Sequence, residues 1–199
     1  MYTLKKIEEI VFLELFAAVI LVCIAVKIAL SATIQIEVSA TFRPAVKASG
    51  ASSILLEGIS INGQPNIQDS LTLSTDNAVN YLGNSLTLPV YSQTGKMRIS
   101  APLFSEDVEV YCSETGGITD GRGSKIPIEQ FYIAVSGNNN NRCKGAKDSA
   151  LRVIVNNYSG NTLHFGAKIN GESLMGILPH YYSSSYLGGE GVRVNVFYK

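Results

Sequence analysis

The sequence predicts an all-β protein, an immunoglobulin-like β-sandwich preceded by an apolar leader. Segments in which apolar and polar residues alternate recur after residue 31 and are separated by turn residues such as Asn62-Gly63. No segment in that part of the chain keeps a helical period of 3.6 residues. The chain of 199 residues is 46% hydrophobic and 16% charged, which argues against disorder.

The leader comprises residues 1–31. Lys5 and Lys6 precede the apolar stretch LFAAVILVCIAV (residues 15–26), and small residues in A-x-S spacing allow cleavage after Ser31. A basic start, a short apolar core and small residues at the cut are typical of a secretory signal peptide. We therefore expect the mature chain to begin at Ala32.

Two alternatives for the leader stay open. Glu8, Glu9 and Glu14 lie unusually close to the apolar core. The stretch from Ile10 to Ala32 is also nearly long enough to span a bilayer, so the leader could be an uncleaved anchor. The segment VFLELFAAVILV also faintly resembles the start of a type IV pilin. The β-alternation that begins at Thr33 departs from that family, in which helix continues past the membrane segment.

The mature chain would open with the strongly alternating stretch ATIQIEVSATF, residues 32–42. A period of two predicts a strand with one buried face. Its apolar side is formed by Ile34, Ile36, Val38, Ala40 and Phe42. Exposed outside the fold, such a strand would be an adhesive edge.

The rest of the chain predicts short strands separated by turns, about eight or nine in all, which is the spacing of a sandwich. The expected strands are Ile54–Ile61, Ser70–Thr75, Asn84–Tyr91, Gly95–Ser100, Asp107–Cys112, Ile128–Ser136, Leu151–Tyr158, Thr162–Ile169 and the closing VRVNVFYK. Residues 113–125 and 137–149 are expected to be polar loops.

The cysteines predict one disulfide. Cys23 lies in the leader, so an exported chain retains the pair Cys112 and Cys143. No CxxC motif is present, and His164 and His180 have no zinc-ligand spacing. We expect no metal and no cofactor.

The residues give no sign of catalysis. The two histidines accompany no nucleophile motif, and the glycine pairs lack the strand–loop–helix context of a phosphate loop. An enzyme is the least supported class. Lys plus Arg and Asp plus Glu both number 16, so the chain has no excess of positive charge that would attract nucleic acid. Within HYYSSSY, Tyr181, Tyr182 and Tyr186 form a candidate ligand-binding surface.

Four features together carry a family resemblance: the leader, ATIQIEVSATF at the mature start, the all-β body, and the closing strand VRVNVFYK with a penultimate Tyr198. On these features the chain resembles the chaperone–usher pilus subunits, which include the fimbrial and capsule-like surface antigens of Gram-negative bacteria. Both retained cysteines lie in the second half of the chain. In many classical members, by contrast, the disulfide ties the first strand of the body to an early neighbouring strand. The resemblance is therefore to a non-classical or capsule-like branch.

The resemblance implies a structural fibre subunit that supports adhesion. Residues 32–42 would be a donor strand that completes a neighbour's sandwich, and residues 43–199 would be an incomplete sandwich. Partners would be copies of the chain or related subunits, a periplasmic chaperone, an outer-membrane usher and a host-cell receptor. The protein would pass through the periplasm to the cell surface. The strand captured by the chaperone would present Val192, Val194, Val196, Tyr198 and the terminal Lys199.

Two other functions stay open. One is a membrane-anchored or secreted β-sandwich that binds a ligand through its tyrosine-rich loop, and the other is a type IV pilin-like protein. A first strand paired within its own chain would favour the binding module alone. Neither the receptor nor the position of the subunit in a fibre follows from the sequence.

Overall fold

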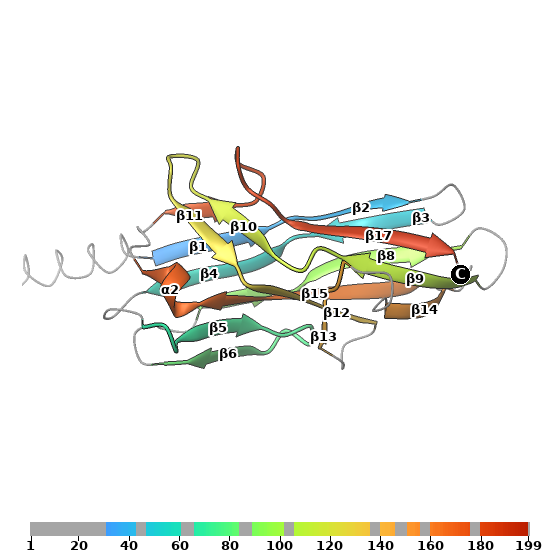
Figure 1. Cartoon of the computed structure of the whole chain (residues 1–199), viewed down its shortest axis with the longest axis horizontal. Helices are drawn as coiled ribbons and strands as arrows, with labels where there is room; N and C mark the ends of the chain where they lie inside the picture. Colours follow the sequence, from blue (N-terminus) through green and yellow to red (C-terminus); the bar gives the residue numbers. More distant parts are fainter. Residues whose placement is uncertain are drawn as a thin grey trace, which may run out of the picture.

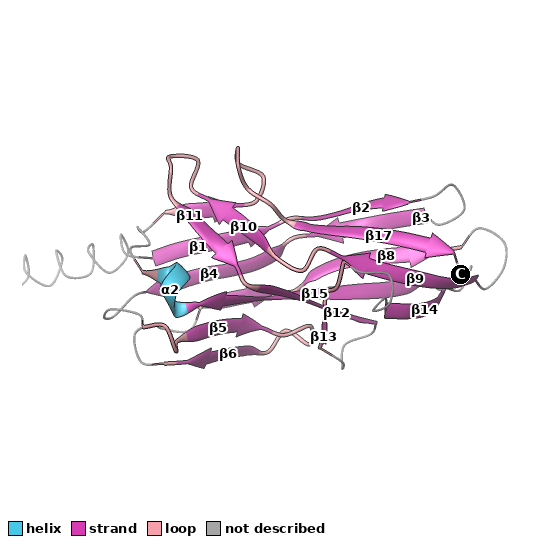
Figure 2. Cartoon of the chain, in the orientation of Figure 1, coloured by secondary structure: helices cyan, strands magenta, loops and turns pink. Residues whose placement is uncertain are grey.

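Strands account for nearly all the regular structure of the residues that the structure describes, as the sequence predicts (Figure 2). The computed structural model describes residues 31–42, 47–60, 66–83, 89–101, 106–135, 140–145, 151–155, 160–175 and 180–198. Within these ranges the regular helix is one turn, α2 (Gly171–Leu174). The predicted leader and Lys199 lie outside the described residues, apart from Ser31.

The first sheet has six strands and contains the start of the described chain (Figure 1). Its order is β11 (Lys125–Ile128), β10 (Gly116–Thr119), β16 (Tyr181–Ser183), β1 (Ser31–Ile36), β4 (Ile54–Ser60) and β7 (Tyr91–Gln93). β1 pairs in parallel with β16, and its pairing with β4 is antiparallel. The first strand is therefore internal to this sheet.

The second sheet has seven strands arranged around the long strand β15 (Asn161–Asn170). The other members are β13 (Asn141–Arg142), β12 (Gln130–Val135), β5 (Ser70–Leu73), β6 (Val79–Leu82), β8 (Gly95–Ser100) and β3 (Lys47–Ser52). One half of β15 pairs with β5 and the other half with β8, which in turn pairs with β3. All of these pairings are antiparallel, including that of β12 with β15.

The third sheet has four strands and ends on the second part of the N-terminal segment. Its order is β14 (Leu151–Val155), β9 (Glu106–Cys112), β17 (Val192–Tyr198) and β2 (Val38–Phe42). β17 is antiparallel to β9 and parallel to β2. The second part of the N-terminal segment and the last strand of the described chain therefore lie side by side (Figure 1).

One continuous core joins the three sheets. Alternation explains how each strand reaches it: in β8, Met97 and Ile99 are buried, while Lys96 and Arg98 face solvent. The buried aromatic rings of Phe131 and Phe165 come from the second sheet and pack with apolar side chains of the other two.

The number of strands differs from the prediction, because the described residues alone hold seventeen where about eight or nine were expected. Residues 113–125 were expected to be one loop, yet they hold β10 and the start of β11. Pro89 and Val90 were expected in a strand and lie in a loop before β7. Short edge strands of two to four residues carry too little alternation to be recognised. No helix in the described ranges is long and apolar enough to cross a membrane.

Candidate functional site

The predicted donor strand lies within the fold of its own chain. Ile34 and Ile36 of β1 are 1% and 0% exposed, so their apolar face packs in the shared core. On one side of β1, Ile34 is opposite Tyr182, and on the other it is opposite Leu56. Burial of such a side chain stabilises a fold by roughly 1.5–3 kcal/mol. The two strands that pair with β1, β16 and β4, belong to the same chain.

The N-terminal segment passes from the first sheet to the third at Glu37. The backbone nitrogen of Glu37 donates to Ser184 Oγ over 2.6 Å, and its carbonyl accepts a hydrogen bond from the nitrogen of Val192 over 2.7 Å. A side chain at Gly191 would collide with that carbonyl, so the close approach requires glycine there. The crossover is held on both sides by residues from the other end of the chain.

Beyond the crossover, β2 pairs with β17, the strand predicted to be captured by a chaperone. Val38, Ala40 and Phe42 lie opposite Val192, Val194 and Val196. The three valines of β17 are buried, as is Val38, while Ala40 is half-buried. The backbone of Tyr198 pairs with Val108.

The structure therefore brings the two predicted end strands together within one chain. Nothing is described of the side chains of Phe42 and Tyr198.

The predicted disulfide is confirmed. Cys112, at the end of β9, is bonded to Cys143, which follows β13, and the two are separated by 31 positions in the sequence. Both sulfur-bearing residues are at most 2% exposed. The bond joins the third sheet to the edge of the second.

The tyrosine-rich loop divides its three candidate residues between core and surface. Tyr181 and Tyr186 are 42% and 40% exposed, and their rings meet edge to face with centroids 6.1 Å apart and planes 69° apart. Tyr182 points the other way and is fully buried. Partial burial, followed by the neighbouring Tyr186, raises the pKa of Tyr181 above its ordinary value.

The loop between β10 and β11 supports this aromatic pair. Asp120 Oδ1 accepts hydrogen bonds from the backbone nitrogens of Arg122 and Ser124 at 2.8 and 3.0 Å. These bonds, led by the one from Arg122, lower the pKa of Asp120, because they stabilise its charged form. Gly121 in the same turn lies under the ring of Tyr186.

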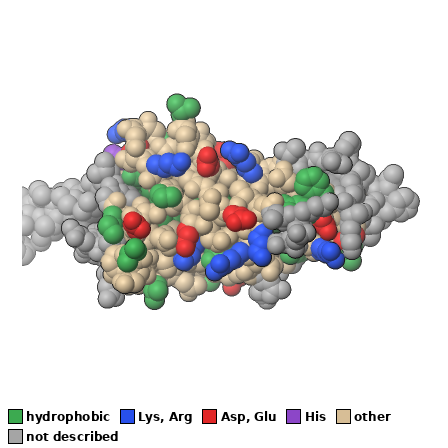
Figure 3. Space-filling model, in the orientation of Figure 1, with side chains coloured by type: hydrophobic (Ala, Val, Ile, Leu, Met, Phe, Trp, Pro, Cys, Tyr) green, Lys and Arg blue, Asp and Glu red, His purple; other side chains and the backbone are tan. Residues whose placement is uncertain are grey.

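Leu187 completes the surface and was not identified from the sequence. It is 99% exposed and follows Tyr186 directly. The signal available in the sequence was an apolar residue within SSSYLGG, a stretch otherwise made of small and polar residues. We call Tyr181, Tyr186 and Leu187 the tyrosine surface. The face shown in Figure 3 mixes charges of both signs with scattered hydrophobic side chains.

Neither histidine takes part in a recognisable catalytic arrangement with described residues. His164 lies on β15 opposite Lys96, and His180 precedes β16. Among the described residues, no three His, Cys, Asp or Glu side chains are grouped closely enough to hold a metal ion. The arrangement offers contact surfaces and hydrogen-bonding groups.

No protein-family model matches the chain, and no curated protein matches it.

Proposed function

We propose that the chain is a self-complete, extracytoplasmic β-module that binds a partner protein through the tyrosine surface. The observation that carries this proposal is the pairing of the first strand with its own sheets, β1 between β16 and β4 and β2 against β17. A chain that fills its own slot presents no core groove for a neighbour to complete. Its free surfaces then become the sites of interaction.

The path of the first strand supports the immunoglobulin-like sandwich. In the first sheet β1 is antiparallel to β4 and parallel to β16, and β2 continues the segment in the third sheet, parallel to the last strand, β17. Strands that pass from one packed sheet to another occur in sandwich folds. The crossover at Glu37 gives this chain that path. Modules of this plan commonly present binding residues on the loops that connect their strands.

The disulfide supports a location outside the cytoplasm. Cystine bonds persist in oxidising compartments such as the periplasm and the cell surface. The predicted leader, as a cleaved signal or as an anchor, gives the same location.

The composition of the tyrosine surface favours a protein partner. Tyrosine offers a large rigid apolar face with a polar tip, and it is enriched at the centres of protein interfaces. Leu187 would fill an apolar pocket of the partner. Arg122 and Glu190 are exposed on the adjoining loops and would form the charged rim.

Site-specific photo-crosslinking tests this function. Leu187 is replaced by p-benzoylphenylalanine in cells that produce the protein. The control carries the same substitution at Leu82, another exposed leucine, which is 68% exposed. We expect one discrete adduct from position 187, none from position 82, and loss of the adduct in Y181A/Y186A. Equal labelling from both positions, or no adduct at 187, would contradict the proposal.

A fibre subunit assembled by strand exchange is the second candidate. The observation that favours it is that β1 and β2 form the start of the described chain and β2 is an edge strand, held by β17 alone in its ladder. Once the expected leader is cleaved, this segment would be terminal and could leave its place without threading through the fold, and the same segment of another copy could replace it. Copies of the chain, a chaperone and an usher would then be its partners. In a fibre, β2 of one copy would pair with β17 of the next.

A further inference from the structure

Exposed apolar side chains gather at the end of the described fold where β15 is followed by α2. Ile67 and Leu82 are 67% and 68% exposed, and Met175 is 50% exposed. Leu82 ends β6 opposite Ser70 of β5, and Ser70 lies opposite Asn170 at the end of β15. Met175 follows directly after α2. We call Ile67, Leu82 and Met175 the apolar corner.

Backbone hydrogen bonds join the segments that carry the apolar corner. The carbonyl of Asn66 accepts a bond from the nitrogen of Asp69 at 3.1 Å, which closes the turn before β5. The carbonyl of Asp69 accepts a bond from the nitrogen of Gly171 at 2.7 Å, which ties that turn to α2. Leu174 anchors α2 in the core. A group of exposed apolar side chains marks a contact surface, whereas single ones are ordinary.

The described chain begins at this same end (Figure 1). Figure 1 places the start of β1 at the end of the molecule that holds α2, the start of β5 and the end of β6. Ser31 already belongs to β1, where it pairs with Ser60, and the next residue, Ala32, is buried in the core. No residue is left as a linker between the leader and the fold. Figure 3 shows hydrophobic side chains along this end.

The sequence just before β1 has the length and composition of a membrane span. From Ile10 to Leu30 it contains no Gly or Pro, and its charged residues are Glu14 and Lys27. A helix of that many residues is about 31 Å long, close to the thickness of a hydrocarbon core of about 30 Å. Both charges are within four positions of an end of the stretch, from where long side chains can reach the interface.

The charges before this stretch favour one orientation. Lys5 and Lys6 precede it, and basic residues next to a span stay on the cytoplasmic side. The fold that follows the span would then lie outside the cytoplasm. The bond between Cys112 and Cys143 suits that side, because disulfides persist in oxidising compartments.

We propose that residues 10–30 are retained as a membrane anchor and that the apolar corner rests on the extracytoplasmic surface of the lipid bilayer. A span that ends where β1 begins holds this end of the fold at the lipid headgroups. Ile67, Leu82 and Met175 would leave water for the boundary between headgroups and acyl chains. The apolar corner shares no residue with the tyrosine surface, so the proposal does not rest on the function proposed above. A retained anchor would also tether β1, which favours the self-complete module over strand exchange.

Quenching of a fluorescent label by nitroxide lipids tests the contact. The complete chain, in a Cys23→Ser background, carries Leu82→Cys or Met175→Cys as the labelling site. It is reconstituted in phosphatidylcholine vesicles that contain a lipid with a nitroxide on its headgroup. The matched control is Ile154→Cys, since Ile154 is 64% exposed and lies on β14 at the other end of the molecule (Figure 1). The strands β1 and β2, which run between the two ends, together measure about 35 Å.

We expect intact-mass measurement to show that protein extracted from membranes retains residues 10–30. Labels at positions 82 and 175 should be quenched about threefold or more above the label at position 154, because a corner seated at the headgroup–acyl boundary meets the nitroxide directly. A mature protein that begins at Ala32 would overturn the proposal. Equal quenching at all three positions would overturn it as well, because the corner would then be no closer to lipid than the far end.

Discussion

His164 shows how one neighbouring strand sets the charge of a side chain. Its imidazole is partly withdrawn from water and lies opposite the ammonium of Lys96. Burial first, and then Lys96, lowers the pKa of His164 from its ordinary value of 6.5. A neutral imidazole has one nitrogen that donates and one that accepts a hydrogen bond.

Because the pKa of His164 is lower in the folded state, the unfolded state binds more protons in acid. Stability from this group is therefore fully present above pH 6.5 and declines as the pH falls through that value. We expect an NMR titration of His164 to give an apparent pKa below 6.5, and K96M to move it upward. A pKa at or above 6.5 in the unaltered protein would contradict this account.

The disulfide is a second feature of single residues with a measurable effect. It closes a loop with a sequence separation of 31 between Cys112 and Cys143. The double substitution C112S/C143S should lower the free energy of unfolding by about 3–4 kcal/mol, since an open loop gains chain entropy when unfolded. Urea unfolding measures this loss. Reductant should destabilise the unaltered protein and leave the double variant unchanged.

At the scale of elements, the first strand is a full member of the core. Ile36→Ala should lower the free energy of unfolding by about 2–5 kcal/mol, because it removes buried methyl groups and leaves a cavity. The neighbouring Glu37→Ala changes an exposed side chain and should stay within about 0.5 kcal/mol. Urea unfolding compares the two. A loss below about 1 kcal/mol for Ile36→Ala would mean that β1 is not packed as described.

The same strand shows what the sequence can and cannot predict. The alternation from Ile34 to Phe42 predicts a strand with one buried face, and that strand is observed. The pattern carries no information about which sheet receives it. The crossover at Glu37 depends on Ser184 and Val192, which are about 150 positions away.

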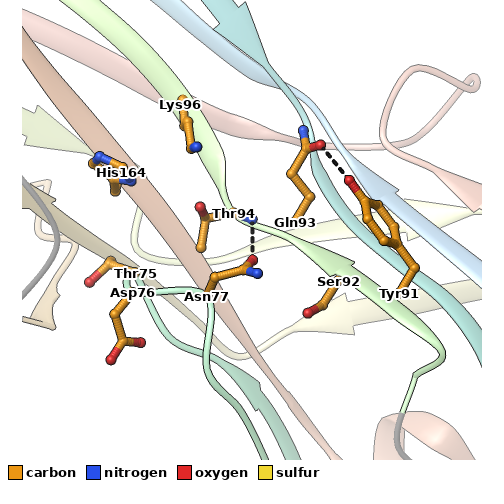
Figure 4. A pocket seen from close by; sticks show the side chains of 9 residues that line it. All are labelled: Thr75, Asp76, Asn77, Tyr91, Ser92, Gln93, Thr94, Lys96 and His164. Atoms are coloured by element: carbon orange, nitrogen blue, oxygen red, sulfur yellow. Dashed lines mark hydrogen bonds between the residues drawn. The ribbon is translucent and has the colours of Figure 1, made fainter.

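For the candidate sites too, the sequence pattern identifies residues without saying which of them lie at the surface or close together. The tyrosines of the HYYSSSY stretch were predicted as a ligand surface, but the strand β16 turns Tyr182 into the core and leaves Tyr181 and Tyr186 outside. A strand of three residues is too short for its period to assign faces from the sequence. The pocket beside the turn between β5 and β6 brings together three separate segments, so no single stretch of sequence marks it (Figure 4). These segments are residues 75–77, residues 91–94 with Lys96, and His164. The disulfide could be predicted because only two cysteines, Cys112 and Cys143, lie outside the expected leader.

At the scale of the whole molecule, the two ends of the described chain close the fold on each other. β1 and β2 span two of the three sheets, and β17 holds β2 along its length. A closed molecule of this kind acts through its surfaces, whereas a molecule that exchanged this segment would form polymers. The partner of β2, in the same chain or in another, therefore decides between the two candidate functions.

An engineered disulfide between β2 and β17 tests that point most directly. Ser39 and Arg193 lie opposite each other and are both exposed, so S39C/R193C in a Cys23→Ser background should form a bond without disturbing the core. On a non-reducing denaturing gel of the oxidised, exported protein, a self-complete module predicts a cross-linked monomer. A ladder of covalent multimers that disappears with reductant would contradict it, since it would place β2 in a neighbouring copy.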